Sequence, residues 1–247
     1  MERQKACGIT FAAMNRLVVD EQARLREFRE GWPEQPAILK GIARAISWLF
    51  HPVFLPVYLM LFLTYEHPYL FAGFNNWHKA RVVMMALLMF TFFPIVTLLL
   101  LKGLKFIDSI YLRTQKDRVI PFIATMIWYF WIWYVWKNMA NVPDALEMPG
   151  PAVQFALACF ISTILGLMMN IRMKISLHAI AAGVVVTFMF LLAFNEGFHF
   201  GTWLALSIFM AGSVCTSRLI VSDHSAEEIY VGLLTGVVSM LLASWLG

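Results

Sequence analysis

Seven apolar segments are the feature of this sequence that most limits its fold. They lie near residues 45–65, 80–101, 119–137, 151–170, 177–195, 201–217 and 224–245. Each has, or approaches, the roughly 20 residues that a helix needs to cross about 30 Å of hydrocarbon. A helix satisfies its own backbone hydrogen bonds, whereas an open sheet edge in lipid leaves N–H and C=O groups unpaired. We therefore predict an all-α, polytopic transmembrane helical bundle with six or seven spans.

The composition supports this fold class. Apolar residues make up 60% of the 247 residues, against roughly 45–50% in an average soluble domain. Charged residues make up 14%, where about 25% is usual. The mean hydropathy is +0.71. These values exclude a water-soluble enzyme, a disordered chain and a nucleic-acid-binding module. We expect the membrane, and no nucleic acid, among the partners; the oligomeric state stays open.

The polar residues divide the chain into two parts. Residues 1–44 form the only long polar stretch, and residues 45–247 hold the apolar segments. We predict a polar N-terminal tail followed by one transmembrane domain. Residues 18–30 are compatible with a short amphipathic helix that lies on the membrane surface. A tail without regular structure is the alternative.

The positive charges are distributed unevenly across the predicted membrane. If every segment crosses once, residues 1–44 share one side with the loops 102–118, 171–176 and 218–223. Eight Lys and Arg residues stand in the tail, five in the first loop and three in the other two, which leaves three of the 19 for the opposite side. Loops rich in Lys and Arg stay in the cytoplasm, so the charge count predicts a cytoplasmic tail.

Three polar clusters interrupt the apolar sequence on the side of the tail. They lie at residues 113–121, 174–178 and 217–228. Each cluster precedes or opens an apolar segment, so each lies at a predicted helix N-terminus. We therefore expect the three clusters to meet at one end of the bundle.

The residues of these clusters suit helix starts. Pro121 is typical of a first helical turn, and Ser176 and either Ser222 or Asp223 are typical N-caps. Helix N-termini present unpaired N–H groups and the positive ends of helix dipoles, which bind phosphate.

Four cations add positive charge at the same end. These are Arg113, Lys116, Arg118 and Arg218. Arginine grips phosphate oxygens with two parallel hydrogen bonds, and lysine acts as a point charge. Gathered around one spot, they repel each other unless an anion joins them, and a phosphate ester at headgroup depth fits this role. For the cations of the first loop, topology signalling without any site is the alternative interpretation.

Two histidines complete the set. His224 and Glu228 are four residues apart, which places them on one face of a helix. A carboxylate there holds the imidazole in one tautomer and makes it a better nucleophile. His178, near the start of another helix, can protonate a leaving alkoxide. For His51, which opens the first segment, a hydrogen-bonding role in helix packing is as good an interpretation as a functional one.

The third cluster carries a family resemblance. Ser217 and Arg218 are followed by five residues, then His224, three more residues and Glu228. This spacing resembles the S-R-x5-H-x3-D motif of the type 2 phosphatidic acid phosphatase (PAP2) superfamily, with Glu in place of Asp.

The other two clusters match the family's remaining motifs in part. Ser176 and His178 occupy the Ser and His of the P-S-G-H motif, whose Pro and Gly are replaced. Lys116, Arg118 and Pro121 resemble the K-x6-R-P motif with a different spacing. The resemblance covers roughly residues 105–235.

The resemblance implies a PAP2-like core and an activity. His224 is then the nucleophile that forms a phosphohistidine, Glu228 supports it, and His178 protonates the leaving group. The residues expected to hold the phosphoryl oxygens are Arg218, Lys116, Arg118, Ser176 and Arg113. No metal and no cofactor are implied. The expected substrate is a lipid phosphomonoester or pyrophosphate.

The sequence leaves the function and the side of the membrane undecided. The alternative function is a non-catalytic protein that binds or transports an anionic lipid, and a third function is transfer of the phosphoryl group to an acceptor other than water. The resemblance favours a bacterial inner membrane. Many bacterial members of the family have a site that faces the periplasm, whereas the charge count favours a site that faces the cytoplasm.

Overall fold

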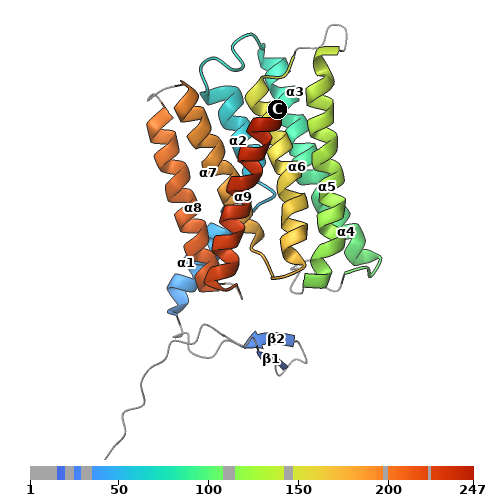
Figure 1. Cartoon of the computed structure of the whole chain (residues 1–247), viewed down its shortest axis with the longest axis vertical. Coiled ribbons are helices and arrows are strands. Elements are labelled where there is room, and N and C mark those ends of the chain that lie inside the picture. Colours follow the sequence, from blue (N-terminus) through green and yellow to red (C-terminus); the bar gives the residue numbers. More distant parts are fainter. Residues whose placement is uncertain are drawn as a thin grey trace, which may run out of the picture.

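The computed structural model describes residues 16–19, 25–28, 35–107, 115–141, 147–196, 200–221 and 224–247. Within these ranges the chain is a bundle of long helices (Figure 1), which confirms the predicted all-α polytopic fold. The helices are α1 (Ala37–Leu49), α2 (Leu55–Leu61), α3 (Asn76–Ala86), α4 (Phe93–Gly103), α5 (Gln115–Asn138), α6 (Gly150–Asn170), α7 (Leu177–Glu196), α8 (Gly201–Val221) and α9 (Ala226–Leu246). Short π-helical turns η1 (Phe62–Glu66) and η2 (Leu87–Phe92) continue α2 and join α3 to α4, and the 3-10 turn η3 (Met139–Asn141) ends α5.

Six helices in the described residues are long and apolar enough to cross a membrane. They are Asn76–Gly103, Gln115–Asn138, Gly150–Asn170, Leu177–Asn195, Gly201–Val221 and Ala226–Leu246. These are the second to seventh apolar segments of the sequence. The chain is therefore an integral membrane protein by the length and composition of its helices.

The first apolar segment is not a single span, so that prediction is wrong. The chain leaves the helix after Leu49 and resumes it at Leu55. Pro52 lies in this break and lacks a backbone N–H, and its ring disfavours a helical conformation of His51. The apolar helix that follows, Leu55–Glu66, is only about 18 Å long at 1.5 Å per residue.

The N-terminal region also differs from its prediction. The described parts of residues 18–30 are not helical: β1 (Arg16–Val19) pairs antiparallel with β2 (Leu25–Phe28). Helix α1 begins at Ala37, inside the stretch predicted as a tail. Its Ala43 and Ser47 are buried, and the helix packs against α8.

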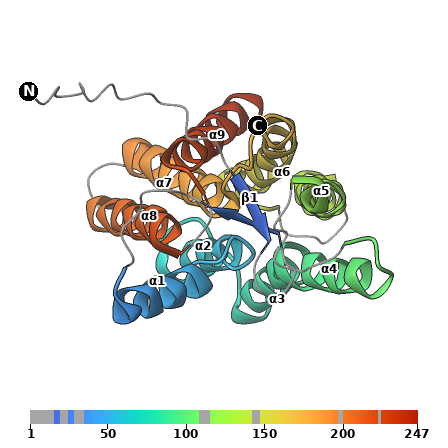
Figure 2. The ribbon, with the colours of Figure 1, turned by 90° about the horizontal axis from the view of Figure 1, so that it is seen from below.

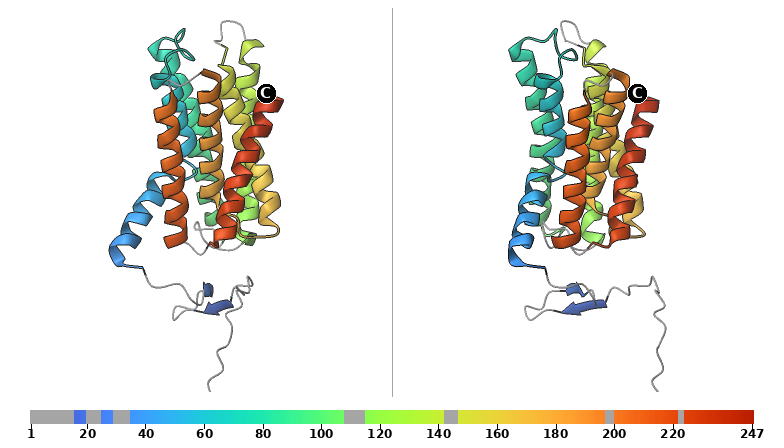
Figure 3. Two further views of the ribbon diagram at one scale, coloured as in Figure 1. Left: turned by 60° about the vertical axis from the view of Figure 1, so that its left-hand side comes forward. Right: turned by 90° about the vertical axis from the view of Figure 1, so that its left-hand side faces the viewer.

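The three predicted clusters lie at the same end of the bundle. Figures 1 and 3 show the starts of α5, α7 and α9 at the lower end, beside the ends of α4, α6 and α8. One detail is corrected. Pro121 lies inside α5, which is already helical at Gln115, and not in a first turn. A proline at this position removes one backbone donor, the N–H that would bond to the carbonyl of Asp117, and its ring crowds that carbonyl.

Helix α7 is at the centre of this arrangement. It packs against α6, α8 and α9 (Figure 2). Two glycines of α9, Gly232 and Gly236, stand four residues apart at its crossing with α7, a spacing that lets membrane helices approach closely. A Cβ on Gly232 would lie 2.9 Å from Ser176 O, and one on Gly236 would overlap Ile180 O. The backbones of α7 and α9 are therefore in direct contact next to the starts of both helices.

Candidate active site

The first turn of α9 is closed by a capping box. Ser225 Oγ accepts a hydrogen bond from Glu228 N at 3.1 Å, and Glu228 Oε2 accepts one from Ser225 N at 2.9 Å. Ser225 is therefore the N-cap of α9, and the prediction of Ser222 or Asp223 in that position is wrong. Ser225 is the cap in place of Ser222 or Asp223 because it and Glu228 form the S-x-x-E pattern, which satisfies the N–H groups of both Ser225 and Glu228. Residues 222 and 223 lie outside the described residues.

The same carboxylate contacts His224. Nδ1 of His224 lies 3.1 Å from Glu228 Oε2. The spacing suggested that His224 and Glu228 share a helix face. They do not, because His224 precedes the helix; the contact forms because the Glu228 side chain reaches back over the cap. A carboxylate only accepts, so Nδ1 carries the proton and Nε2 keeps its lone pair. This is the tautomer that a nucleophilic histidine needs.

The surroundings of His224 favour its neutral form. Burial is the largest influence and lowers the pKa of the imidazole below its usual value; the hydrogen bond to Glu228 opposes this, and the charges of Arg118 and Arg218 lower the pKa further. His224 is 3% exposed. The imidazole of His224 is therefore neutral at neutral pH.

Of the cations predicted in the first cluster, the structure brings Arg118 to this site. Arg118 is buried, and its Nη1 donates to Ile175 O at 2.6 Å. Lys116 is exposed and stands two residues from Arg118, on a different face of α5. Lys116 is therefore not brought into the cluster, and Arg113 lies outside the described residues.

Ser176 links the start of α7 to the other two clusters. It is fully buried, directly follows the carbonyl that binds Arg118, and its N donates to Glu228 O at 3.4 Å. Its backbone oxygen accepts from Ile180 N, but its Oγ has no hydrogen-bond partner among the described residues. The side chain is therefore not the N-cap that the sequence suggested. A buried hydroxyl without a partner costs about 1–3 kcal/mol, which a ligand oxygen would recover.

His178 pairs with a residue that the sequence left undecided. The rings of His51 and His178 meet edge to face, with centroids 5.1 Å apart. His178 Nε2 lies 3.2 Å from Ser47 O, and because a carbonyl only accepts, Nε2 carries the proton. His51 comes from the break between α1 and α2, where Val53 N donates to its Nδ1. The helix break at Pro52 is the sequence signal that could have placed His51 here.

Arg218 lies among the three imidazoles. Its charge acts on His51, His178 and His224. In His51, burial and then the Arg218 charge lower the pKa of the imidazole to about 4. Arg218 lies in the last turn of α8 and is half-buried, so α8 supplies a cation near the start of α9.

Asn170 is a further buried polar residue at this end that the sequence analysis did not single out. It ends α6 and is 2% exposed. Its Nδ2 donates to Gln115 O at 2.9 Å, and its Oδ1 has no partner. The signal was available, because an asparagine closes an otherwise apolar segment.

Together these residues form what we call the histidine–arginine cluster. Its members are His51, Arg118, Ser176, His178, Arg218, His224 and Glu228. It combines two guanidinium groups and an unpaired hydroxyl with one carboxylate and three imidazoles. The cluster thus presents an excess of donors and positive charge, which suits a small anion. Among the described residues, no group of three or more His, Cys, Asp or Glu side chains is arranged to hold a metal ion.

Comparisons of the chain with family models, with curated proteins and with solved structures gave no match in any of the three. The fold and the cluster define the class of the protein as a polytopic helical membrane protein with a polar site at one end of its bundle.

Proposed function

We propose that the protein is a membrane phosphatase that hydrolyses a lipid phosphomonoester or pyrophosphate through a phosphohistidine on His224. The observation that carries the proposal is the 3.1 Å contact of His224 Nδ1 with Glu228 Oε2, within reach of the charges of Arg118 and Arg218. Phosphoryl transfer needs a positioned nucleophile and positive charge on the transferring group. The resemblance to the type 2 phosphatidic acid phosphatases supports the same assignment.

In the first step, the His224 Nε2 lone pair forms a bond to phosphorus while the bond from phosphorus to the lipid oxygen breaks. Glu228 stabilises the positive charge that develops on the ring, and Arg118 and Arg218 neutralise the phosphoryl oxygens. The bound phosphate favours the doubly protonated form of His178, which gives one proton to the leaving alkoxide and becomes neutral. In the doubly protonated form Nδ1 also carries a proton, so His178 can donate to the lipid oxygen while Nε2 keeps its bond to Ser47 O.

In the second step, water attacks the phosphohistidine. Neutral His178 takes a proton from the water as it forms the new bond to phosphorus, and the bond to His224 Nε2 breaks. Inorganic phosphate leaves and both histidines return to their starting states. The same residue acts as acid in one half and as base in the other.

The side of the membrane is part of the proposal. The charge count favours a cytoplasmic position for the cluster and the N-terminus, and the family resemblance favours a bacterial inner membrane. Reaction of single cysteines introduced at residues 40 and 246 with a membrane-impermeant thiol reagent, in intact and opened cells, measures the orientation. Labelling of residue 40 in intact cells would reverse the assignment.

The test of the activity is phosphate release by the purified protein in detergent with EDTA present. The panel contains phosphatidate, phosphatidylglycerophosphate, a polyprenyl diphosphate and lipid A. We expect His224→Ala to abolish release and trapping of a phosphohistidine, and His78→Ala to leave both unchanged. His78 is the matched control because it lies on α3, at the opposite end of the bundle. Turnover by His224→Ala would overturn the mechanism.

One observation favours a second function, which is binding of an anionic lipid without turnover. The Nε2 proton of His178 is engaged by Ser47 O, so neutral His178 has no second proton to give to a leaving group. This function predicts saturable binding of phosphatidate with no phosphohistidine and no phosphate release over the whole panel.

A further inference from the structure

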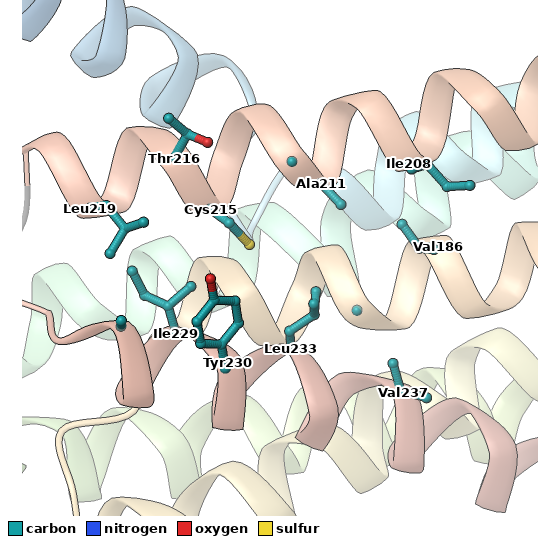
Figure 4. Close-up of a pocket in the computed structure, with 13 residues that line it drawn as sticks. Val186, Ile208, Ala211, Cys215, Thr216, Leu219, Ile229, Tyr230, Leu233 and Val237 are labelled. Atoms are coloured by element: carbon teal, nitrogen blue, oxygen red, sulfur yellow. The ribbon is translucent and has the colours of Figure 1, made fainter.

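An apolar groove runs along the outside of the bundle beside the histidine–arginine cluster. It has a volume of about 410 Å³ and is formed by α7, α8 and α9. Figure 4 shows Leu219 and Cys215 of α8 facing Ile229, Tyr230 and Leu233 of α9 across it. Its volume lies in the range of ligand sites, roughly 300–1,000 Å³.

The groove exists because α8 and α9 both pack on α7 and only slightly on each other. Its floor and walls include small residues, among them Gly183, Ala211 and Gly212. A Cβ on Gly212 would meet nothing within 4 Å, whereas one on Gly183 would overlap Leu233 O. The groove is therefore open on the α8 side and closed by the contact of α7 with α9 behind it.

The length of the groove matches one leaflet of a bilayer. Along α8 its lining extends from Leu219 to Ile208, and along α9 from Ala226 to Val237. Each stretch spans eleven residue steps, or about 16 Å at 1.5 Å per residue. Half of a hydrocarbon core is about 15 Å. The groove thus extends from the end of the bundle to about the middle of the membrane.

One end of the groove reaches the cluster. Leu219 directly follows Arg218, and Ala226 directly follows Ser225, the N-cap whose partner Glu228 holds His224. The polar end and the apolar groove are therefore neighbours along both α8 and α9. A phosphate at the cluster would have its attached chain beside Leu219 and Ala226.

We propose that the groove holds one hydrocarbon chain of the lipid whose phosphate is bound by the histidine–arginine cluster. The proposal rests on the proposed function for the identity of the headgroup. It specifies the substrate class: a phosphate ester carrying at least one chain long enough to reach the middle of the bilayer. The lipid reaches the site laterally, between α8 and α9.

The first test fills the groove at half depth with Gly212→Phe. We compare phosphate release from dipalmitoyl and dihexanoyl phosphatidate in detergent. We expect kcat/KM for the long-chain lipid to fall by about tenfold, the loss expected when roughly two methylenes lose apolar contact, with no change for the short-chain lipid. Gly201→Phe, on α8 at the opposite end, is the matched control because a Cβ there also meets nothing within 4 Å. Equal effects on both lipids, or none, would overturn the groove assignment.

The second test does not depend on turnover. Phosphatidate with a diazirine at the end of one chain is photolysed with the His224→Ala protein in phosphatidylcholine vesicles. We expect labels near Ile208 and Val237, which excess phosphatidate prevents and excess diacylglycerol does not. Such labelling without turnover of the wild-type protein would refute the phosphatase and support the groove. Turnover with labels elsewhere, or with labels that diacylglycerol prevents equally, would refute the groove and leave the phosphatase standing.

Discussion

Glu228 performs two tasks with one oxygen atom, and the two can be separated by substitution. Oε2 accepts from Ser225 N at 2.9 Å and from His224 Nδ1 at 3.1 Å. In Glu228→Gln the amide oxygen can accept both bonds, so the cap and the tautomer are kept while the negative charge is lost. In Ser225→Ala, the bond from Glu228 N to Ser225 Oγ is lost while the bond between Glu228 and His224 is kept.

The expected magnitudes differ accordingly. A hydrogen bond to a charged group stabilises by about 1–2 kcal/mol more than a neutral one, so Glu228→Gln should lower kcat about five- to thirtyfold. Its thermal stability should stay close to that of the wild type. Ser225→Ala should lower the free energy of unfolding by about 1 kcal/mol, the usual loss for an N-cap, with kcat nearly unchanged. Glu228→Ala should show both losses.

The assay combines phosphate release at saturating lipid, acid-labile phosphohistidine after a rapid quench, and thermal unfolding in detergent. An equal loss of kcat in Ser225→Ala and Glu228→Gln would show that the two roles of Glu228 are not separate. A wild-type kcat in Glu228→Gln would show that the carboxylate charge does not support the nucleophile.

Three further outcomes are expected. Burial and the two arginines lower the pKa of His224, and the nucleophile is neutral above that pKa. The acid limb of the kcat/KM profile should therefore lie below the usual value of about 6.5; a pH–rate profile with its acid limb above 7 would contradict this. Gly232→Leu should reduce both thermal stability and turnover, because a Cβ there would lie only 2.9 Å from the Ser176 carbonyl oxygen. Gly41→Leu is the control, because a Cβ on Gly41 meets nothing within 4 Å. Equal unfolding temperatures of the two variants would contradict the prediction. Arg118→Met should lower turnover at least tenfold, because a hydrogen bond to a charged group contributes on the order of 1.5–3 kcal/mol. Lys116→Met should leave turnover within about twofold of the wild type. Similar effects of the two substitutions in a phosphate-release assay would contradict the assignment of Arg118 to the site.

The fold could be predicted from the sequence where a single physical constraint dominates. Six long apolar segments admit only membrane helices, and the alternation of their crossings places the three polar clusters at one end of the bundle. The break at Pro52 was missed because the run of apolar residues continues through it and hides the change of backbone direction.

The site was predictable to the level of its residues but not of its geometry. The contact of His224 with Glu228 was expected for the wrong reason, because three cap formers precede α9 and only the capping box shows which of them is used. Which of Lys116 and Arg118 points into the site depends on where α5 begins, because successive helical residues point about 100° apart. His51 was left undecided, because its contact with His178 joins elements 127 positions apart in the chain and the break at Pro52 that brings it there was missed.

The glycine contact of α7 with α9 has a consequence for how a lipid can enter. At Gly232 and Gly236 the two backbones are in direct contact, so the starts of α7 and α9, which carry Ser176 and Glu228, are held together. Helix α8 packs on α7 and α1 but only slightly on α9. A lipid that parts α8 from α9 would therefore move Arg218, on α8, relative to the carboxylate that holds His224, so the width of the groove and the position of the positive charge on the phosphate are coupled.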